Sequence, residues 1–142
     1  MDKKKVADIM AKRVICLHEE DNLEDIARGM ERYNLRHLPV VSDDKLVGLI
    51  SHRDLLRLAV SSLKLETLAG QKRQKNIEEN TFVVQVMTKN PQTVRPDTSI
   101  KEALEILLES KFGCLPVTDE DGMLVGIVTE VDFLKLLMEN LG

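Results

Sequence analysis

The sequence predicts an α+β protein made of two copies of one β-α-β-β-α unit, related by pseudo-twofold symmetry. Three observations predict this class. The chain of 142 residues repeats itself, and each repeat changes between the apolar period of a strand and that of a helix. The composition, with 43% hydrophobic and 31% charged residues, is typical of a globular protein.

The repetition is defined by an alignment of the first half of the chain with the second. Four pairs fix it, the first two offset by 77 positions and the last two by 78: Met10 with Met87, Pro39 with Pro116, Gly48 with Gly126, and Asp54 with Asp132. The one extra residue falls in a turn sequence, where an insertion costs least. We interpret this as a duplication, with repeat 1 at 1–63, a linker at 64–81 and repeat 2 at 82–142.

Each repeat is expected to begin with a short strand, at 14–17 (VICL) and 92–94 (QTV), followed by a helix. The helices are predicted to start at Asn22 and Ser99, because "SIKE" is a capping box and "NLED" offers the same polar residue types. Apolar residues then recur with the helical period, at Leu23, Ile26, Ala27 and Met30 in one repeat and at Ile100, Ala103, Leu104 and Leu107 in the other.

A β-hairpin and a second helix complete each repeat. The hairpins pair 37–41 with 46–50 and 114–118 with 124–128, through the turn sequences "SDDK" and "DEDG". The second helices open at Ser51 and Thr129, and their apolar residues are Leu55, Leu56 and Leu58 in one repeat and Phe133, Leu134, Leu136 and Leu137 in the other. One repeat of roughly 50–60 residues buries little surface alone, so we expect the two to pack face to face.

Charge and composition exclude several classes of partner. The formal net charge is −4, acids and bases are interspersed, and four aromatic residues are present, which argues against nucleic acid. No apolar run approaches the roughly 20 residues that span a bilayer, and the N-terminus lacks the apolar stretch of a secretory signal. Two cysteines, Cys16 and Cys114, fit a reducing compartment. We therefore predict a cytoplasmic protein with neither nucleic acid nor membrane as a partner.

Ser51, His52 and Asp54 are the residue types of a hydrolytic triad, but their spacing argues against one. Side chains at i, i+1 and i+3 of a helix start diverge, whereas a triad is assembled from distant segments. The duplicate reads Thr-Glu-Val-Asp and lacks the histidine. We predict no catalytic residues and no enzyme activity. The three histidines show no metal-ligand spacing with the cysteines, so no metal site is expected either.

The same motif has two further interpretations, which the residues alone leave open. Ser51 with Asp54, and Thr129 with Asp132, stand at the spacing of an N-cap and the third helical residue. A cap alone, worth about 1 kcal/mol, explains the residue types. A ligand can be added without removing the cap, because a helix N-terminus offers N–H groups to phosphate and a carboxylate one turn in can accept ribose hydroxyls.

The two repeats resemble a tandem pair of CBS domains, also called a Bateman module. The resemblance rests on "DIM" and "QVM", on "LRHLPVV" and "FGCLPVT", and above all on "GLISHRD" and "GIVTEVD". The last two fit the Gly–apolar–apolar–Ser/Thr–x–x–Asp signature of the family. The resemblance covers nearly the whole chain apart from the linker and the ends, and implies a stand-alone CBS pair.

Members of this family are not catalytic and bind adenine nucleotides or related adenosyl ligands in clefts between the two repeats. The resemblance therefore implies a regulatory module that binds a ligand of the AMP, ADP or ATP class and signals by conformational change. It implies a homodimer and a client protein whose identity the sequence does not give. No cofactor is required, and a magnesium ion would arrive with the nucleotide phosphates.

The resemblance also assigns roles to residues. Asp54 and Asp132 would hold ribose, with Ser51 and Thr129 near ribose or phosphate. The backbone around Ile15 and Gln92 would read the edges of adenine.

Phosphate contacts would come from the two residues before Leu-Pro, which are Arg36 and His37 in repeat 1 and the uncharged Gly113 and Cys114 in repeat 2. Sites of the family cross between repeats. The better phosphate site is therefore expected to combine Thr129, Asp132, Ile15, Arg36 and His37, and the other to combine Ser51, Asp54 and Gln92 with Arg53 as its cation. Glu130 and Val131 replace the basic residues of "HRD", which argues against strong triphosphate binding.

A ligand-free interaction module is the competing interpretation. The segments "LLRLAVSSLKL" and "FLKLLMENL" carry enough apolar residues to form a twofold dimer interface. Repeats and caps alone do not separate this function from nucleotide binding.

Overall fold

The computed structural model describes residues 4–64, 81–110 and 112–141, so the predicted linker lies, except for its two ends, outside the described residues. The chain forms two compact units. Unit 1 comprises Met1–Ile15, Asp43–Leu46 and Pro91–Gly142, and unit 2 comprises Cys16–Ser42 and Val47–Asn90. Each unit has its own cluster of buried apolar side chains. The predicted α+β class with two repeated units is confirmed.

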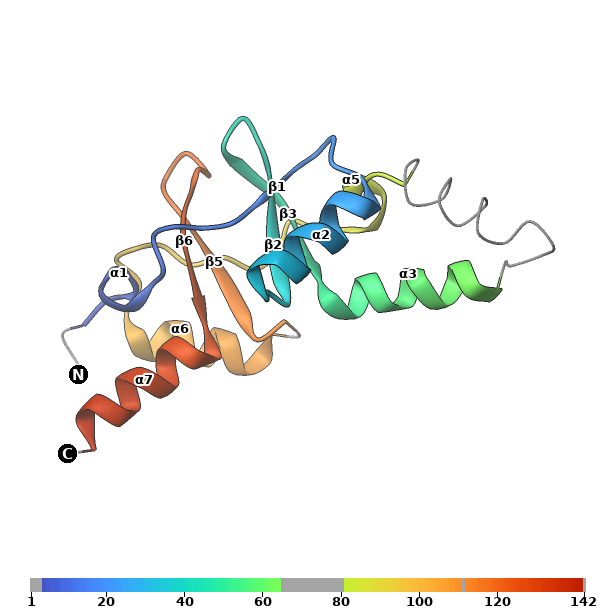
Figure 1. Ribbon diagram of the computed structural model, residues 1–142. Helices are drawn as coiled ribbons and strands as arrows, with labels where there is room; N and C mark the ends of the chain where they lie inside the picture. The colour runs from blue at the N-terminus through green and yellow to red at the C-terminus, as the bar shows by residue number, and fades with distance from the viewer. Residues whose placement is uncertain (1–3, 65–80, 111, 142) are drawn as a thin grey trace. The chain divides into compact units, whose positions relative to one another are not determined.

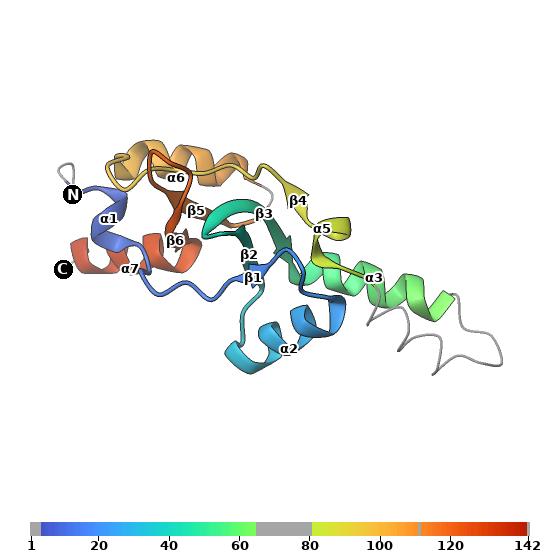
Figure 2. The ribbon, with the colours of Figure 1, turned by 90° about the horizontal axis from the view of Figure 1, so that it is seen from above.

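Unit 2 is a four-stranded sheet with its helices. In chain order its elements are β1 (Leu17–His18), α2 (Leu23–Tyr33), β2 (His37–Ser42), β3 (Lys45–Ser51), α3 (His52–Lys64), α5 (Val83–Val86) and β4 (Thr88–Lys89). The order of strands is β1-β2-β3-β4, with β1 parallel to β2 and β4 antiparallel to β3 (Figure 2). Helices α2 and α3 contact each other. The buried residues of α2 are Leu23, Ile26 and Met30.

Unit 1 is an antiparallel hairpin with three helices. Its elements are α1 (Val6–Ile9), α6 (Ile100–Glu109), β5 (Cys114–Thr118), β6 (Leu124–Thr129) and α7 (Glu130–Asn140), and α7 continues directly from β6 (Figure 1). Every residue of β5 is buried. The hydrophobic cluster of this unit joins the hairpin to α6 and α7 through Leu107, Leu115 and Phe133.

The helix starts follow the predicted capping residues. Asn22 Oδ1 accepts a hydrogen bond from Asp25 N at 3.0 Å, and Asp25 Oδ2 accepts one from Asn22 N at 3.0 Å. Ser99 Oγ accepts from Glu102 N at 3.1 Å. These bonds satisfy N–H groups that a helix leaves without an intrahelical partner, which is why both helices begin where the sequence indicates.

The hairpin turns also follow their sequences. Asp43 and Asp44 have φ of 49° and 66°, the left-handed backbone at both central positions that suits the twist of a two-residue hairpin. Gly122 supplies a φ of 80° in the other turn. Residues 43–46 belong to unit 1. Two hydrogen bonds of 3.0 Å hold them there, from Leu46 N to Gly122 O and from Leu124 N to Asp44 O.

The first strands of the repeats are shorter than predicted. Of the first predicted strand, 14–17, only Leu17 is in a strand, together with His18 beyond the predicted end, and these two residues pair with Val40 and Val41. The segment 92–94 contributes a single bridge, between Val94 and Val117. Prolines at 91 and 96 flank that bridge and lack the N–H groups that would extend the pairing.

Each unit contains the first segment of one repeat and the main part of the other repeat. The sequence did not predict this exchange of segments. Val6 is fully buried in the cluster of unit 1, and Val83 is fully buried in the cluster of unit 2. Equivalent hydrogen bonds hold them. Val6 N donates to Thr98 O at 2.9 Å, and Val83 N donates to Asp21 O at 2.8 Å.

Two glycines allow the close approach that this exchange requires. A Cβ on Gly126 would lie 3.0 Å from the carbonyl oxygen of Ala11 and 2.6 Å from Met10 Sδ. A Cβ on Gly48 would lie 3.0 Å from Thr88 O and would overlap Met87. Gly48 and Gly126 are equivalent in the alignment, as are Met10 and Met87, so both units use the same contact.

The predicted apolar faces of the helices are only partly buried. Leu104 of α6 is 38% exposed, and Leu134 and Leu137 of α7 are 58% and 48% exposed. The helical period places Leu104 and Leu137 at the border of the buried stripe of their helix, whereas Leu134 lies on the outer side of α7. The exposed apolar residues of α6, of α7 and of its C-cap are named here together the α6–α7 face, whose members are Leu104, Leu108, Val131, Leu134, Leu137, Met138 and Leu141.

Candidate functional site

The first Ser/Thr–x–x–Asp motif forms a closed set of hydrogen bonds at the junction of β3 and α3. Asp54 Oδ2 accepts from the backbone N–H of Ser51 and from its hydroxyl, both at 2.9 Å. Ser51 Oγ in turn accepts from Asp54 N at 3.2 Å. Ser51 is buried and Asp54 is half-buried. The predicted helix cap is confirmed for this motif.

The second motif repeats two of these three hydrogen bonds at the junction of β6 and α7. Asp132 Oδ2 accepts from Thr129 N at 2.8 Å and from the Thr129 hydroxyl at 3.3 Å. Asp132 is half-buried, like its counterpart. The duplication therefore extends to the geometry of the motif.

In each of the two aspartates, one carboxylate oxygen takes no part in the helix cap. The hydrogen bonds go to Oδ2 in both motifs, and among the described residues Oδ1 of Asp54 and of Asp132 takes part in none. An ionised carboxylate accepts on both oxygens. Each motif can therefore keep its cap and still accept hydrogen bonds from a ligand.

The geometry at 51–54 differs from that of a hydrolytic triad. In a triad the serine hydroxyl donates to the histidine, whereas here the Ser51 hydroxyl donates to Asp54. His52 lies on the exposed side of the first turn of α3. Its backbone N–H donates to Arg36 O at 2.7 Å, which brings the start of β2 next to the start of α3.

The predicted site residues divide between the two units. Unit 2 holds Arg36, His37, Ser51, Arg53 and Asp54, and unit 1 holds Ile15, Gln92, Thr129 and Asp132. Arg36, Arg53, Ile15 and Gln92 are exposed, and His37 is half-buried. Within unit 2 the structure brings Arg36 to the Ser51 motif through the bond to His52. The predicted combination of Arg36 and His37 with Thr129 and Asp132 stays a prediction.

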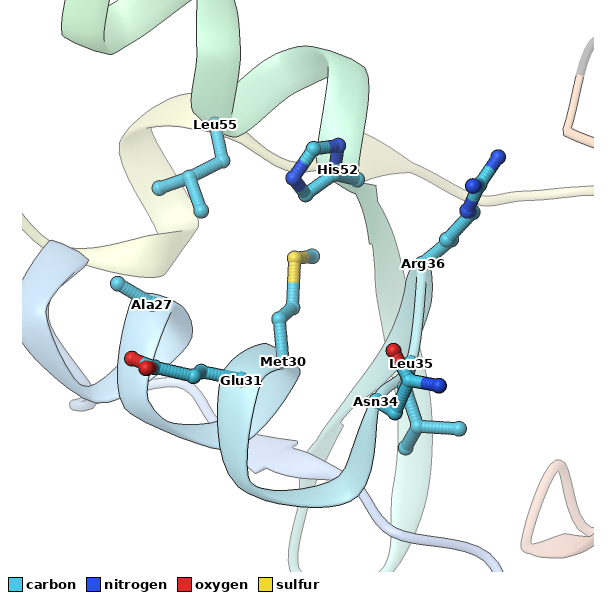
Figure 3. A pocket seen from close by; sticks show the side chains of 8 residues that line it. All are labelled: Ala27, Met30, Glu31, Asn34, Leu35, Arg36, His52 and Leu55. Carbon is cyan, nitrogen blue, oxygen red and sulfur yellow. The ribbon is translucent and has the colours of Figure 1, made fainter.

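A pocket of about 440 Å³ lies between α2, α3 and the start of β2, entirely within unit 2. The residues that line it are Ala27, Met30, Glu31, Asn34, Leu35, Arg36, His52 and Leu55. In Figure 3 the side chains of Met30, His52 and Leu55 point toward the same space, while the Arg36 guanidinium extends away from it. No sequence pattern marks Glu31 or Asn34, because the pocket arises from the packing of two helices.

Glu130 occupies the corresponding place in unit 1. Its N–H donates to Gly113 O at 3.2 Å, and its Oε1 lies 2.9 Å from the position that a Cβ on Gly113 would take. Gly113 has a φ of 69°, a backbone conformation that glycine adopts readily. The carboxylate of Glu130 thus folds over the start of β5.

Cys114, the next residue, is 1% exposed, and its environment changes the chemistry of its thiol. Burial, with a further contribution from the charge of Glu130, raises the pKa of Cys114 from 9.0 to about 12. Both causes disfavour the thiolate, which is the charged form of the side chain. We infer that Cys114 is a protonated, unreactive side chain in the folded protein.

This pKa predicts how stability depends on pH. Between pH 9 and about 12 the unfolded state ionises while the folded state keeps its proton, so the contribution of Cys114 is complete below pH 9 and is lost as pH rises. The free energy of unfolding of the wild type, relative to Cys114→Ala, is expected to fall by roughly 1 kcal/mol from pH 8 to pH 10. Urea unfolding of both proteins at the two pH values measures this. An unchanged difference would contradict the raised pKa.

The described part of the chain lacks both a metal-ligand cluster and a membrane-spanning helix. No group of three or more His, Cys, Asp or Glu side chains in residues 4–64, 81–110 and 112–141 could hold a metal ion. Over the same residues, no helix has the length and apolar character needed to cross a membrane.

Comparison with known proteins identifies the family of these repeats. The family model of the CBS domain matches residues 6–61 and 83–139. Over 132 residues the chain is 33% identical to uncharacterized protein MJ1225 of Methanocaldococcus jannaschii, covering 92% of this chain and 46% of that protein. The chain thus spans less than half the length of this relative.

Two solved structures with bound ligands are similar over nearly the whole chain. CBSX2 of Arabidopsis thaliana in complex with AMP is 30% identical, with a TM-score of 0.79, covering 96% of this chain and 97% of that one. The CBS domain pair of protein MJ0100, in complex with 5'-methylthioadenosine and S-adenosyl-L-methionine, is 25% identical, with a TM-score of 0.77 and the same two coverages.

Proposed function

Because this chain belongs to the CBS domain family, we propose that it binds an adenosyl ligand of the AMP, ADP or ATP class and regulates a client protein by conformational change. The observation that carries this proposal is the duplicated motif. Each Asp caps a helix through Oδ2 and keeps Oδ1 for a ligand. The complexes of CBSX2 with AMP and of MJ0100 with methylthioadenosine and S-adenosylmethionine support the class of ligand.

The proposed roles of the residues come from their match to the motifs of the CBS family. Asp54 and Asp132 accept the hydroxyls of ribose, as acidic residues do in dinucleotide-binding folds. Ser51 and Thr129 lie beside them. The remaining members of the proposed binding set are Ile15 and Gln92, through their backbone toward adenine, and Arg36, His37 and Arg53 toward phosphate.

A thermal-shift series tests the proposal. The compounds are AMP, ADP, ATP, 5'-methylthioadenosine and S-adenosylmethionine, with GMP as the control for the base and ATP measured with and without magnesium. A ligand that binds only the folded state and is present at 100 times its Kd stabilises by about 2.7 kcal/mol. At least one adenosyl compound is expected to raise the Tm. The absence of a shift with all five would favour the interaction module.

The α6–α7 face supports a second function of the same chain, self-association into a homodimer. Six of its seven exposed apolar side chains lie on two helices of unit 1 and the seventh, Leu141, is the C-cap of α7; Met138 and Leu108 are 73% and 79% exposed. Val131, Leu134 and Met138 recur with the helical period and so share one side of α7. An exposed apolar patch marks an interaction surface, and a twofold interface pairs one patch with itself. Sedimentation equilibrium is expected to show a dimer for the wild type and a monomer for Leu134→Glu. Lys135→Glu, also exposed on α7, serves as the control. A dimer in all three would place the interface elsewhere.

A further inference from the structure

We infer that the two motifs select ligands of different charge: the Ser51–Asp54 motif takes an adenosyl ligand that carries phosphate, and the Thr129–Asp132 motif takes a neutral or cationic adenosyl ligand, with Glu130 as the residue that excludes phosphate. This inference rests on the proposed function and names the ligand class at each motif. It differs from the sequence expectation, which assigned Arg36 and His37 to Thr129 and Asp132.

The Ser51–Asp54 motif has basic side chains around it within unit 2. His52 and Arg53 are the first two residues of α3, and the bond from His52 N to Arg36 O at 2.7 Å holds Arg36 beside them. All three are exposed, and none forms an ion pair with another described residue. Glu31 is the one acid among the residues that line the adjoining pocket. With Asp54 itself this makes two acids beside Arg36 and Arg53, so the surroundings of this motif are more favourable to an anion than surroundings whose charges are acidic.

The Thr129–Asp132 motif has the opposite character within unit 1. The residues that correspond to Arg36, His52 and Arg53 are Gly113, Glu130 and Val131. The N–H of Glu130 donates to Gly113 O and its exposed side chain lies over Gly113, so its charge stands at the start of α7, on the same helical turn as Asp132. Two carboxylates at one helix start repel a phosphate, whereas a sulfonium or amino group would be attracted to them.

The two motifs share a backbone arrangement but have neighbouring side chains of opposite charge. We therefore attribute the difference in charge to a difference in the ligand that each motif binds. The bond from Glu130 N to Gly113 O is the counterpart of the bond from His52 N to Arg36 O. In both motifs the aspartate accepts the N–H of the N-cap residue on Oδ2, which leaves Oδ1 to a ligand. The side chains around the two caps are therefore the part of the site that differs. Charged groups near a binding site discriminate between partners by their charge.

Single-motif proteins test the inference by calorimetric titration. Asp132→Ala retains the Ser51–Asp54 motif, and Asp54→Ala retains the Thr129–Asp132 motif. Asp132→Ala is expected to bind AMP at least tenfold more tightly than adenosine. Asp54→Ala is expected to bind adenosine or 5'-methylthioadenosine more tightly than AMP. If an alanine protein is unfolded, the asparagine variant replaces it, because asparagine keeps an oxygen for the cap.

Charge variants then identify the residues responsible. Glu130→Gln in the Asp54→Ala protein is expected to raise the affinity for AMP about tenfold and leave that for adenosine unchanged. Arg36→Gln in the Asp132→Ala protein is expected to lower the affinity for AMP about tenfold, again with adenosine unchanged. Glu139→Gln, an exposed position further along α7, is the matched control and is expected to change neither.

The outcomes separate this inference from the proposed function. If the wild type binds no adenosyl compound, the proposed function fails as well. If the wild type binds but both single-motif proteins show the same ratio of AMP to adenosine affinity, the inference alone fails. A reversed ratio would support the sequence expectation that Arg36 and His37 serve Thr129 and Asp132. Loss of all binding in either single-motif protein would also overturn the inference, since that motif would then have no ligand of its own.

Discussion

Substitution of both Asp54 and Asp132 by alanine is expected to weaken the binding of adenosyl ligands at both motifs. Hydrogen bonds to charged groups contribute about 1.5–3 kcal/mol each, so each single substitution should weaken binding at its own motif by roughly 10- to 150-fold. Titration calorimetry with AMP and 5'-methylthioadenosine measures the loss. Because each Asp also caps a helix, each substitution is expected to cost about 1 kcal/mol of stability in addition.

Asp25→Ala is the matched control for this prediction. Asp25 forms the same kind of reciprocal cap with Asn22 at the start of α2 and is outside both motifs. Its loss should destabilise the protein by a similar amount and leave the affinity unchanged. Retention of affinity in the Asp54→Ala, Asp132→Ala protein would show that the two carboxylates do not hold the ribose.

Val6→Asp is expected to destabilise the protein by about 3–5 kcal/mol, the cost of an unpaired charge in a core. Val6 is fully buried in the cluster of unit 1, against residues that the sequence assigns to repeat 2. Val83→Asp should have the same effect on unit 2, where Val83 is equally buried. Urea unfolding followed by circular dichroism gives the free energies.

Lys5→Asp provides the comparison, because it places the same charge at the exposed N-cap of α1. There a carboxylate is a favourable residue, so little change or a small gain in stability is expected. If Val6→Asp unfolds at the same urea concentration as the wild type, the N-terminal segment does not pack in unit 1 and the exchange of segments is wrong.

The parts of the fold that depend on local chemistry could be predicted from the sequence. Asn22, Ser51 and Ser99 cap their helices because short polar side chains satisfy the first N–H groups of a helix. Asp43 and Asp44 form a hairpin turn because they tolerate a positive φ. The cap at Ser51 and Asp54, predicted from spacing, is present with the expected partners.

The parts that depend on tertiary packing could not be predicted. Helices α1 and α5 each have four residues, too few for a helical period to be visible. Their exchange between repeats is set by contacts such as those of Met10 with Gly126, which the alignment marks as repeated residues without showing that they meet. Arg36 reaches His52 because the start of β2 lies beside the end of β3, a result of the hairpin register.

Titration calorimetry of the wild-type protein with AMP, 5'-methylthioadenosine and S-adenosylmethionine, each raised to millimolar concentration, tests the proposed function most directly. Saturable binding is predicted for at least one of the three, with no binding of GMP under the same conditions. Heats equal to those of dilution for all three adenosyl compounds would contradict the proposal that this CBS pair is an adenosyl-binding module.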